Sequence, residues 1–104
     1  MSLPEWNEKQ FNDFIQSKES GVIEFGASWC GACKETEPEI EIVQKNYEDL
    51  KFAKIDVGKD SALAAKMGVM SLPNVLIFKA GKVVEQFIGA TTAQVLNEKL
   101  SKIK

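Results

Sequence analysis

The feature of this 104-residue sequence that most constrains its fold is the alternation of short apolar runs with helical patterns. Runs with the length and composition of strands lie at residues 22–25, 52–57, 74–79 and 83–88. Glu5-Trp6 is typical of a short edge strand. Strand–helix–strand segments join parallel strands by right-handed crossovers. We therefore predict one α/β domain over residues 1–104, with a mixed central sheet of four to five strands flanked by four helices on its two faces.

The first two helices carry recognisable signals. Asn7 and Gln10 form a capping-box pattern at the start of a helix that fades by Gly21. Residues 31–47 form the second helical segment, and Pro38 lies inside it. An interior proline removes a backbone hydrogen bond, so we expect a kink there.

The second half of the chain carries similar signals. Asp60 is expected to cap a short helix that ends at Gly68. Thr91 and Gln94 form a second capping-box pattern before the last helix. Gly81 lies in the short connection between the last two strands, which predicts an antiparallel hairpin.

The charged residues exclude several kinds of site. All 13 basic residues are lysine, and the sequence has no histidine and no arginine. No Ser-His-Asp or Cys-His catalytic pair can be built, and neither can a histidine-ligated metal site or an arginine clamp for phosphate. The net charge is -2 and no basic cluster is present, which argues against nucleic-acid binding.

The compartment affects how the two cysteines are interpreted. No apolar run approaches the ~20 residues that span a bilayer, and residues 1–5 lack the charged and apolar regions of a secretory signal. We therefore expect a cytoplasmic protein that does not bind membranes. Structural disulfides are disfavoured in the cytoplasm, so a cysteine pair there is more often catalytic or metal-binding.

The candidate reactive pair is Cys30 and Cys33, directly after a predicted strand and at the start of a helix. Two intervening residues place both sulfur atoms on one side of the first helical turn, close enough to bridge. Cys30 lies at the helix N-terminus, where free N–H groups and the helix dipole stabilise a thiolate. Cys33 lies one turn further, so its thiol should be more buried and stay protonated. We expect Cys30 to attack a substrate disulfide and Cys33 to resolve the mixed disulfide.

Two alternative interpretations of this pair remain open. A structural disulfide across so short a loop would stabilise the fold by about 2 kcal/mol at most. A zinc site needs about four ligands, so two thiols would have to be shared by a dimer. A redox dithiol is the preferred interpretation, and we expect no metal and no cofactor.

The sequence resembles the thioredoxin family over nearly its whole length. The similar segments are residues 25–34, Pro38, residues 54–56, Leu72-Pro73, residues 78–81 and Gly89-Ala90. The resemblance implies the thioredoxin fold and a cis proline at Pro73 that faces the dithiol, although a simple turn before a strand is the alternative. It also implies that the Leu72 backbone pairs with an extended substrate. The implied apolar contact surface consists of Trp29, Gly31, Ala32, Pro73, Gly89 and Ala90.

Glu24 and Lys54 form a second candidate cluster, since both lie in strands with apolar neighbours. A buried carboxyl group without a partner has a raised pKa. The family has a buried acid at the position of Glu24, usually aspartate, and a lysine near it. We expect Glu24 to accept the proton of Cys33 and Lys54 to supply supporting charge. A solvent-facing edge position for Glu24 is the alternative.

Three departures from the family pattern are visible. Ala32 replaces the usual proline between the cysteines, and Gly26 stands where many relatives have tryptophan. Four glutamates follow the dithiol. They are either ordinary solvent-exposed charges or charges that influence which partner proteins dock there. They are Glu35, Glu37, Glu39 and Glu41.

The predicted activity is thiol–disulfide exchange that reduces protein disulfides. The resemblance implies a thioredoxin reductase, or an equivalent dithiol donor, as the source of electrons, and disulfide-containing proteins as clients. We expect a monomer. Two alternatives are a dedicated electron donor to one reductase or peroxidase pathway, and a thiol-independent binding module.

Overall fold

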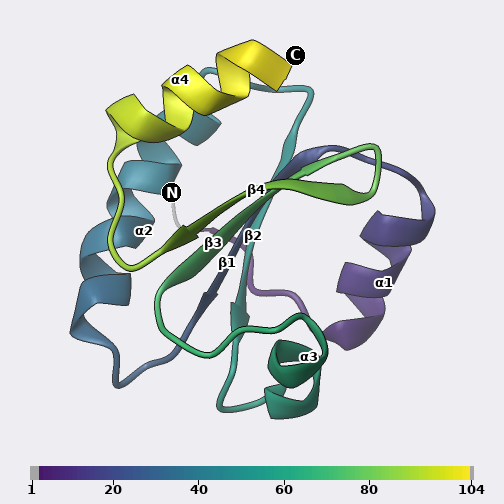
Figure 1. The fold of residues 1–104 in the computed structure, drawn as a ribbon, viewed down its shortest axis with the longest axis vertical. Coiled ribbons are helices and arrows are strands. Elements are labelled where there is room, and N and C mark those ends of the chain that lie inside the picture. The colour runs from purple at the N-terminus through teal and green to yellow at the C-terminus, as the bar shows by residue number, and fades with distance from the viewer. Residues whose placement is uncertain (1–2, 104) are drawn as a thin grey trace.

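The centre of the molecule is a four-stranded mixed sheet with the strand order β2–β1–β3–β4. The computed structural model describes residues 3–103, so residues 1, 2 and 104 lie outside the described residues. Residues 1 and 2 belong to the segment that was assessed above for a secretory signal. Along the chain the elements are α1 (Glu8–Gln16), β1 (Gly21–Gly26), α2 (Gly31–Gln44), β2 (Lys51–Asp56), α3 (Ser61–Lys66), β3 (Asn74–Lys79), β4 (Lys82–Ile88) and α4 (Ala93–Ile103) (Figure 1).

The strand directions make the sheet mixed. β1 is parallel to β2 and antiparallel to β3, and β3 and β4 form the predicted antiparallel hairpin. The direction therefore reverses in the connection through α3, which joins the two halves of the sheet. Beyond β2, Glu5 forms a single parallel bridge with Lys54, and the Trp6 N–H donates to the Lys54 carbonyl at 2.8 Å. The predicted edge strand is thus a bridge rather than a fifth strand.

Helices cover both faces of the sheet, as Figure 1 shows. On one face α1 and α3 pack through Phe11, Phe14 and Leu63 onto the sheet. On the other face α2 and α4 pack through residues such as Ile40 and Leu96. Successive side chains of a strand point to opposite faces, so Ile23 and Phe25 of β1 join the first cluster and Val22 joins the second. Glu24 therefore points to the α2 side.

The N-terminal caps of the helices show where a local sequence signal is sufficient to predict the start of a helix. At α1 the capping box is present, since the Gln10 N–H donates to Asn7 Oδ1 and the Asn7 N–H donates to Gln10 Oε1, both at 2.9 Å. The box predicted at Thr91 is wrong. α4 begins one residue later, with Thr92 Oγ1 accepting from the Val95 N–H at 3.3 Å.

Two further helix starts differ from what the local sequence predicts. Glu39 Oε1, from α2, accepts the Ala93 N–H at 2.9 Å, so a carboxylate from another helix satisfies the first turn of α4. Asp60 occupies the N-cap position of α3, but its side chain makes no capping hydrogen bond there.

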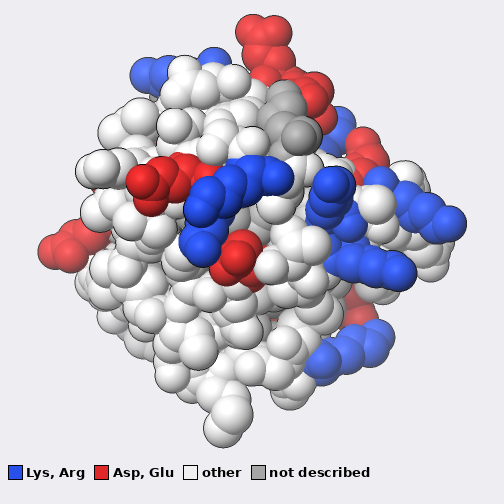
Figure 2. All heavy atoms as spheres, turned by 45° about the horizontal axis from the view of Figure 1, so that its top comes forward, with Lys and Arg blue, Asp and Glu red and all other residues white. Residues whose placement is uncertain are grey.

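The surface charges are mixed in sign. On the face in Figure 2, lysine and carboxylate side chains lie close together in the upper and right-hand parts, while the lower part is largely uncharged. Most of these ion pairs are exposed, such as Lys59–Glu5 at 2.8 Å, and exposed pairs add little to the stability of a fold. The pair Lys54–Glu37 is the more enclosed one, with side chains 30% and 23% exposed. Within residues 3–103, no helix is both long and apolar enough to cross a membrane.

Candidate active site

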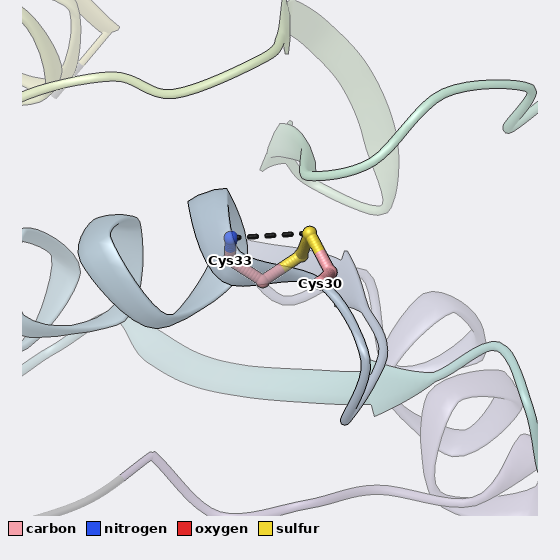
Figure 3. Close-up of a disulfide and its surroundings, with 2 residues drawn as sticks. All are labelled: Cys30 and Cys33. Atoms are coloured by element: carbon pink, nitrogen blue, oxygen red, sulfur yellow. Dashed lines mark hydrogen bonds between the residues drawn. A yellow bond between two sulfur atoms is a disulfide. The ribbon is translucent and has the colours of Figure 1, made fainter.

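The two cysteines lie at the start of α2, immediately beyond the end of β1. Cys30 is the N-cap residue of α2 and Cys33 lies in its first turn. Their sulfur atoms are joined in a disulfide, with 5.3 Å between the Cα atoms. The Cys33 N–H also donates to Cys30 Sγ at 3.1 Å (Figure 3). Cys33 is fully buried and Cys30 is half-buried, so Cys30 is the more accessible residue of the pair.

The sheet register brings two other predicted residues to this end of the molecule. Phe25 of β1 is opposite Asn74 of β3, and Asn74 is opposite Ile88 of β4. Pro73 and Gly89 therefore lie at the same end of the strands as the segment that leads from β1 to Cys30. The Gly89 N–H donates to the Pro73 carbonyl at 2.8 Å, which ties these two loops together.

The predicted contact surface is partly exposed. Trp29 is 70% exposed, Gly31 and Ala90 are exposed, and Ala32, Leu72 and Gly89 are half-buried. Pro73 itself is buried, and the Leu72–Pro73 peptide bond is cis.

Two exposed apolar side chains lie next to this predicted surface along the chain. Met70, two residues before Leu72, is 95% exposed, and Ile88, next to Gly89, is 68% exposed. Sequence reasoning missed both of them. Their adjacency to predicted surface residues was the available signal.

Glu24 is completely buried behind the disulfide. Within residues 3–103, neither of its carboxyl oxygens has a hydrogen-bond partner. A Cβ atom placed on Gly26 would lie 3.1 Å from Cys33 Sγ and 3.5 Å from Glu24 Cδ. The sulfur of Cys33 and the carboxyl of Glu24 therefore border the same small space, which the absence of a side chain at Gly26 leaves open.

The charges near Glu24 raise its pKa. The pKa of Glu24 is raised from 4.5 to about 8: burial is the largest cause, the negative charge of Glu37 contributes to the rise, and the positive charge of Lys54 opposes it. Lys54 is next to Glu24 in the β1–β2 register, but its Nζ pairs with Glu37 Oε1 at 3.2 Å. Glu24 is thus a carboxyl group that stays largely protonated at neutral pH.

Of the four glutamates that follow the dithiol, two have partners on other elements. Glu37 pairs with Lys54 and Glu39 caps α4. Sequence reasoning did not connect Glu37 with the site. The signal was its spacing, because a residue four positions after Cys33 lies on the same face of a helix.

Comparison with known proteins supports one family. The family model for thioredoxin matches residues 2–102. The chain belongs to the thioredoxin family. A thioredoxin from Staphylococcus aureus is 39% identical over 93 residues, covering 86% of this chain and 89% of the relative. Thioredoxin H2 from Arabidopsis thaliana is 35% identical over 94 residues, covering 90% and 70%.

Solved structures of thioredoxins share the fold. The thioredoxin from Trypanosoma brucei brucei superposes with a TM-score of 0.87 at 32% identity, covering 98% of this chain and 90% of that one. Thioredoxin NaTrxh from Nicotiana alata gives a TM-score of 0.84 at 35% identity, covering 97% and 91%. The predicted thioredoxin fold is confirmed, and the protein is a thiol–disulfide oxidoreductase with a redox-active Cys30–Cys33 pair.

Proposed function

We propose that this member of the thioredoxin family is a monomeric, cytoplasmic reductant of protein disulfides, and that Cys30 attacks the substrate while Cys33 resolves the intermediate. The unequal exposure of the two cysteine residues carries the proposal, because the half-buried Cys30 is accessible and the fully buried Cys33 is not. A thioredoxin reductase or an equivalent dithiol donor supplies the electrons. A reducing compartment keeps such a dithiol available.

The reaction proceeds in two exchanges. The Cys30 thiolate attacks one sulfur of the substrate disulfide, forming a mixed disulfide and releasing the other substrate sulfur as a thiolate. Cys33 then loses its proton and attacks the sulfur of Cys30. The mixed disulfide breaks, the second substrate thiolate leaves, and the Cys30–Cys33 disulfide forms. The substrate gains two electrons and the protein loses two.

Glu24 in its ionised form accepts the proton of Cys33 before the second exchange. Its carboxyl and the sulfur of Cys33 border the same space beside Gly26, so transfer is direct or crosses one water molecule. Lys54 supports the negative charge from the neighbouring strand. The residues Trp29, Gly31, Ala32, Leu72, Pro73, Gly89 and Ala90 contact the substrate, with the Leu72 backbone pairing with an extended segment.

Reduction of insulin disulfides with dithiothreitol as the electron source tests the function. The wild-type protein is expected to accelerate the reaction, and the double Cys30→Ser/Cys33→Ser variant is expected to give the uncatalysed rate. If the double variant still supports the cellular role of the protein, the thiol-independent binding module replaces this proposal. A protein that leaves insulin intact yet reduces one specific enzyme is instead a dedicated donor.

Changing Glu24 to glutamine is expected to slow the second exchange about tenfold or more at pH 7. This is below the usual 10²–10⁴-fold contribution of a general base, because Glu24, with a pKa of about 8, is mostly protonated at that pH. Glutamine keeps the size of the side chain but takes up no proton. The measurement is the decay of a mixed disulfide formed in rapid-mixing experiments. An unchanged decay rate would remove Glu24 from the mechanism.

Changing Ala32 to proline is expected to make the protein more reducing. Ala32 contributes an N–H at the start of α2 that can stabilise the Cys30 thiolate, and it restricts the reduced loop less than proline does. Both effects favour the reduced dithiol. Equilibration with glutathione should show a potential lower by tens of millivolts at most, since about 30 mV corresponds to 1.4 kcal/mol. An equal or higher potential for Ala32→Pro contradicts this.

A further inference from the structure

A cavity of about 190 Å³ lies beside Gly26 and is lined by both Glu24 and Glu37. Its wall also includes Gly26 and the exposed residues Ser28 and Lys34, so it reaches the protein surface. This volume has room for several water molecules, and the unpartnered carboxyl oxygens of Glu24 are suitable partners for them. The cavity is therefore a path by which protons can reach the buried carboxyl group.

Glu37 occupies the Lys54 side of this cavity. Its Oε1 atom lies 3.2 Å from Lys54 Nζ, and the two side chains are only 23% and 30% exposed. Lys54 is the register neighbour of Glu24, yet its ammonium group pairs with Glu37. Glu24 therefore has the negative charge of Glu37 nearby. Lys54, which is beside Glu24 in the sheet, pairs with Glu37 instead of with Glu24.

The other charged groups that line the cavity are occupied elsewhere or lie at its exposed rim. Glu5 pairs with Lys59 at 2.8 Å. Asp56 Oδ1 accepts the Gly58 N–H at 2.7 Å. Lys34 is exposed.

On the sides formed by β3 and by Cys33 of α2, the described residues place no charge against Glu24. Its β3 neighbour is the buried Val75, and α2 adds the uncharged sulfur of Cys33. Glu37 and Lys54 are therefore the charged groups that act on Glu24.

We propose that Glu37 is a positioning residue of the exchange reaction: it holds Lys54 away from Glu24, and so determines the pH at which Glu24 can take the proton of Cys33. This inference rests on the proposed function of Glu24. Removing the charge of Glu37 takes away a repulsion and frees Lys54 to approach Glu24. Both changes favour the ionised carboxyl group, so Glu24 ionises at lower pH.

The test compares Glu37→Gln with Glu35→Gln, an equal change of charge at an exposed position of the same helix. The first measurement is the titration of the Glu24 carboxyl carbon by NMR in the oxidised protein. The second is the rate of mixed-disulfide resolution between pH 5.5 and pH 9. In Glu37→Gln we expect both midpoints to move about one unit lower, and the rate at pH 6 to rise up to about tenfold. Glu35→Gln should leave both midpoints in place.

The two measurements separate this inference from the proposed function. If the NMR midpoint of Glu24 in Glu37→Gln coincides with that of the wild type, the role of Glu37 is overturned. If the midpoint moves but Glu24→Gln resolves mixed disulfides at the normal rate, Glu37 still controls Glu24, and the proposed role of Glu24 fails instead. A Glu37→Gln/Glu24→Gln double variant should resolve at the rate of Glu24→Gln alone at every pH.

Discussion

The oxidised wild-type protein is expected to become less stable as the pH rises, and replacing Glu24 by glutamine is expected to abolish the part of this decrease that Glu24 causes. The folded pKa of Glu24 is about 8, above its ordinary value of 4.5, because burial disfavours the charged form. The folded state therefore binds this proton more tightly than the unfolded state does. The stabilisation is complete below about pH 4.5, falls as the pH rises between the two values, and is lost above about pH 8.

The expected size of this effect is large for a protein of this length. Between pH 5 and pH 9, the free energy of unfolding should fall by about 4 kcal/mol more in the wild type than in Glu24→Gln, at about 1.4 kcal/mol per pH unit. Urea unfolding of both oxidised proteins at several pH values measures the difference between their free energies of unfolding. The contributions of the other titrating groups are common to both proteins and cancel in this difference. Glu48→Gln, at an exposed position, is the control and should follow the wild type. Parallel curves for wild type and Glu24→Gln would show that Glu24 is already ionised at pH 5.

The second large effect is the loss of reduction in Cys30→Ser. The first exchange needs a thiolate at the accessible position, and a serine hydroxyl neither ionises near neutral pH nor forms a mixed disulfide. The catalysed rate of insulin reduction should fall by about three orders of magnitude, to background. The fold should persist, because serine at the N-cap of α2 is a favoured residue there.

Cys33→Ser is the matched control for that variant. Its Cys30 can still attack, so one equivalent of substrate thiol should be released rapidly, followed by no turnover. Equal behaviour of the two single variants would mean that the sulfur atoms are interchangeable, contrary to their different burial.

Local signals in the sequence were sufficient where the structure is stabilised locally. Asn7 and Gln10 cap α1 through hydrogen bonds between each other, so their spacing alone reveals the cap. The cap of α4 was misplaced by one residue because Glu39, more than fifty residues earlier, takes part in it. The reversal of strand direction before β3 likewise depends on how the chain packs after α3, which no local pattern encodes.

The same distinction applies to the active site. The position of Cys30 and Cys33 at a strand-to-helix junction follows from two intervening residues and a preceding apolar run. The closeness of Glu24 and Lys54 follows from strand pairing. The ion pair of Lys54 with Glu37 does not, because it joins a strand to a helix that is distant in sequence.

Peptide mass spectrometry of trapped mixed disulfides shows directly whether Cys30 attacks the substrate and Cys33 resolves the intermediate. Cys33→Ser is mixed with a disulfide substrate, remaining thiols are alkylated, and the adduct is digested. We expect a stable substrate adduct on Cys30 in Cys33→Ser and no adduct in Cys30→Ser. A substrate adduct on Cys33 in Cys30→Ser, formed as fast as the adduct on Cys30, would contradict it.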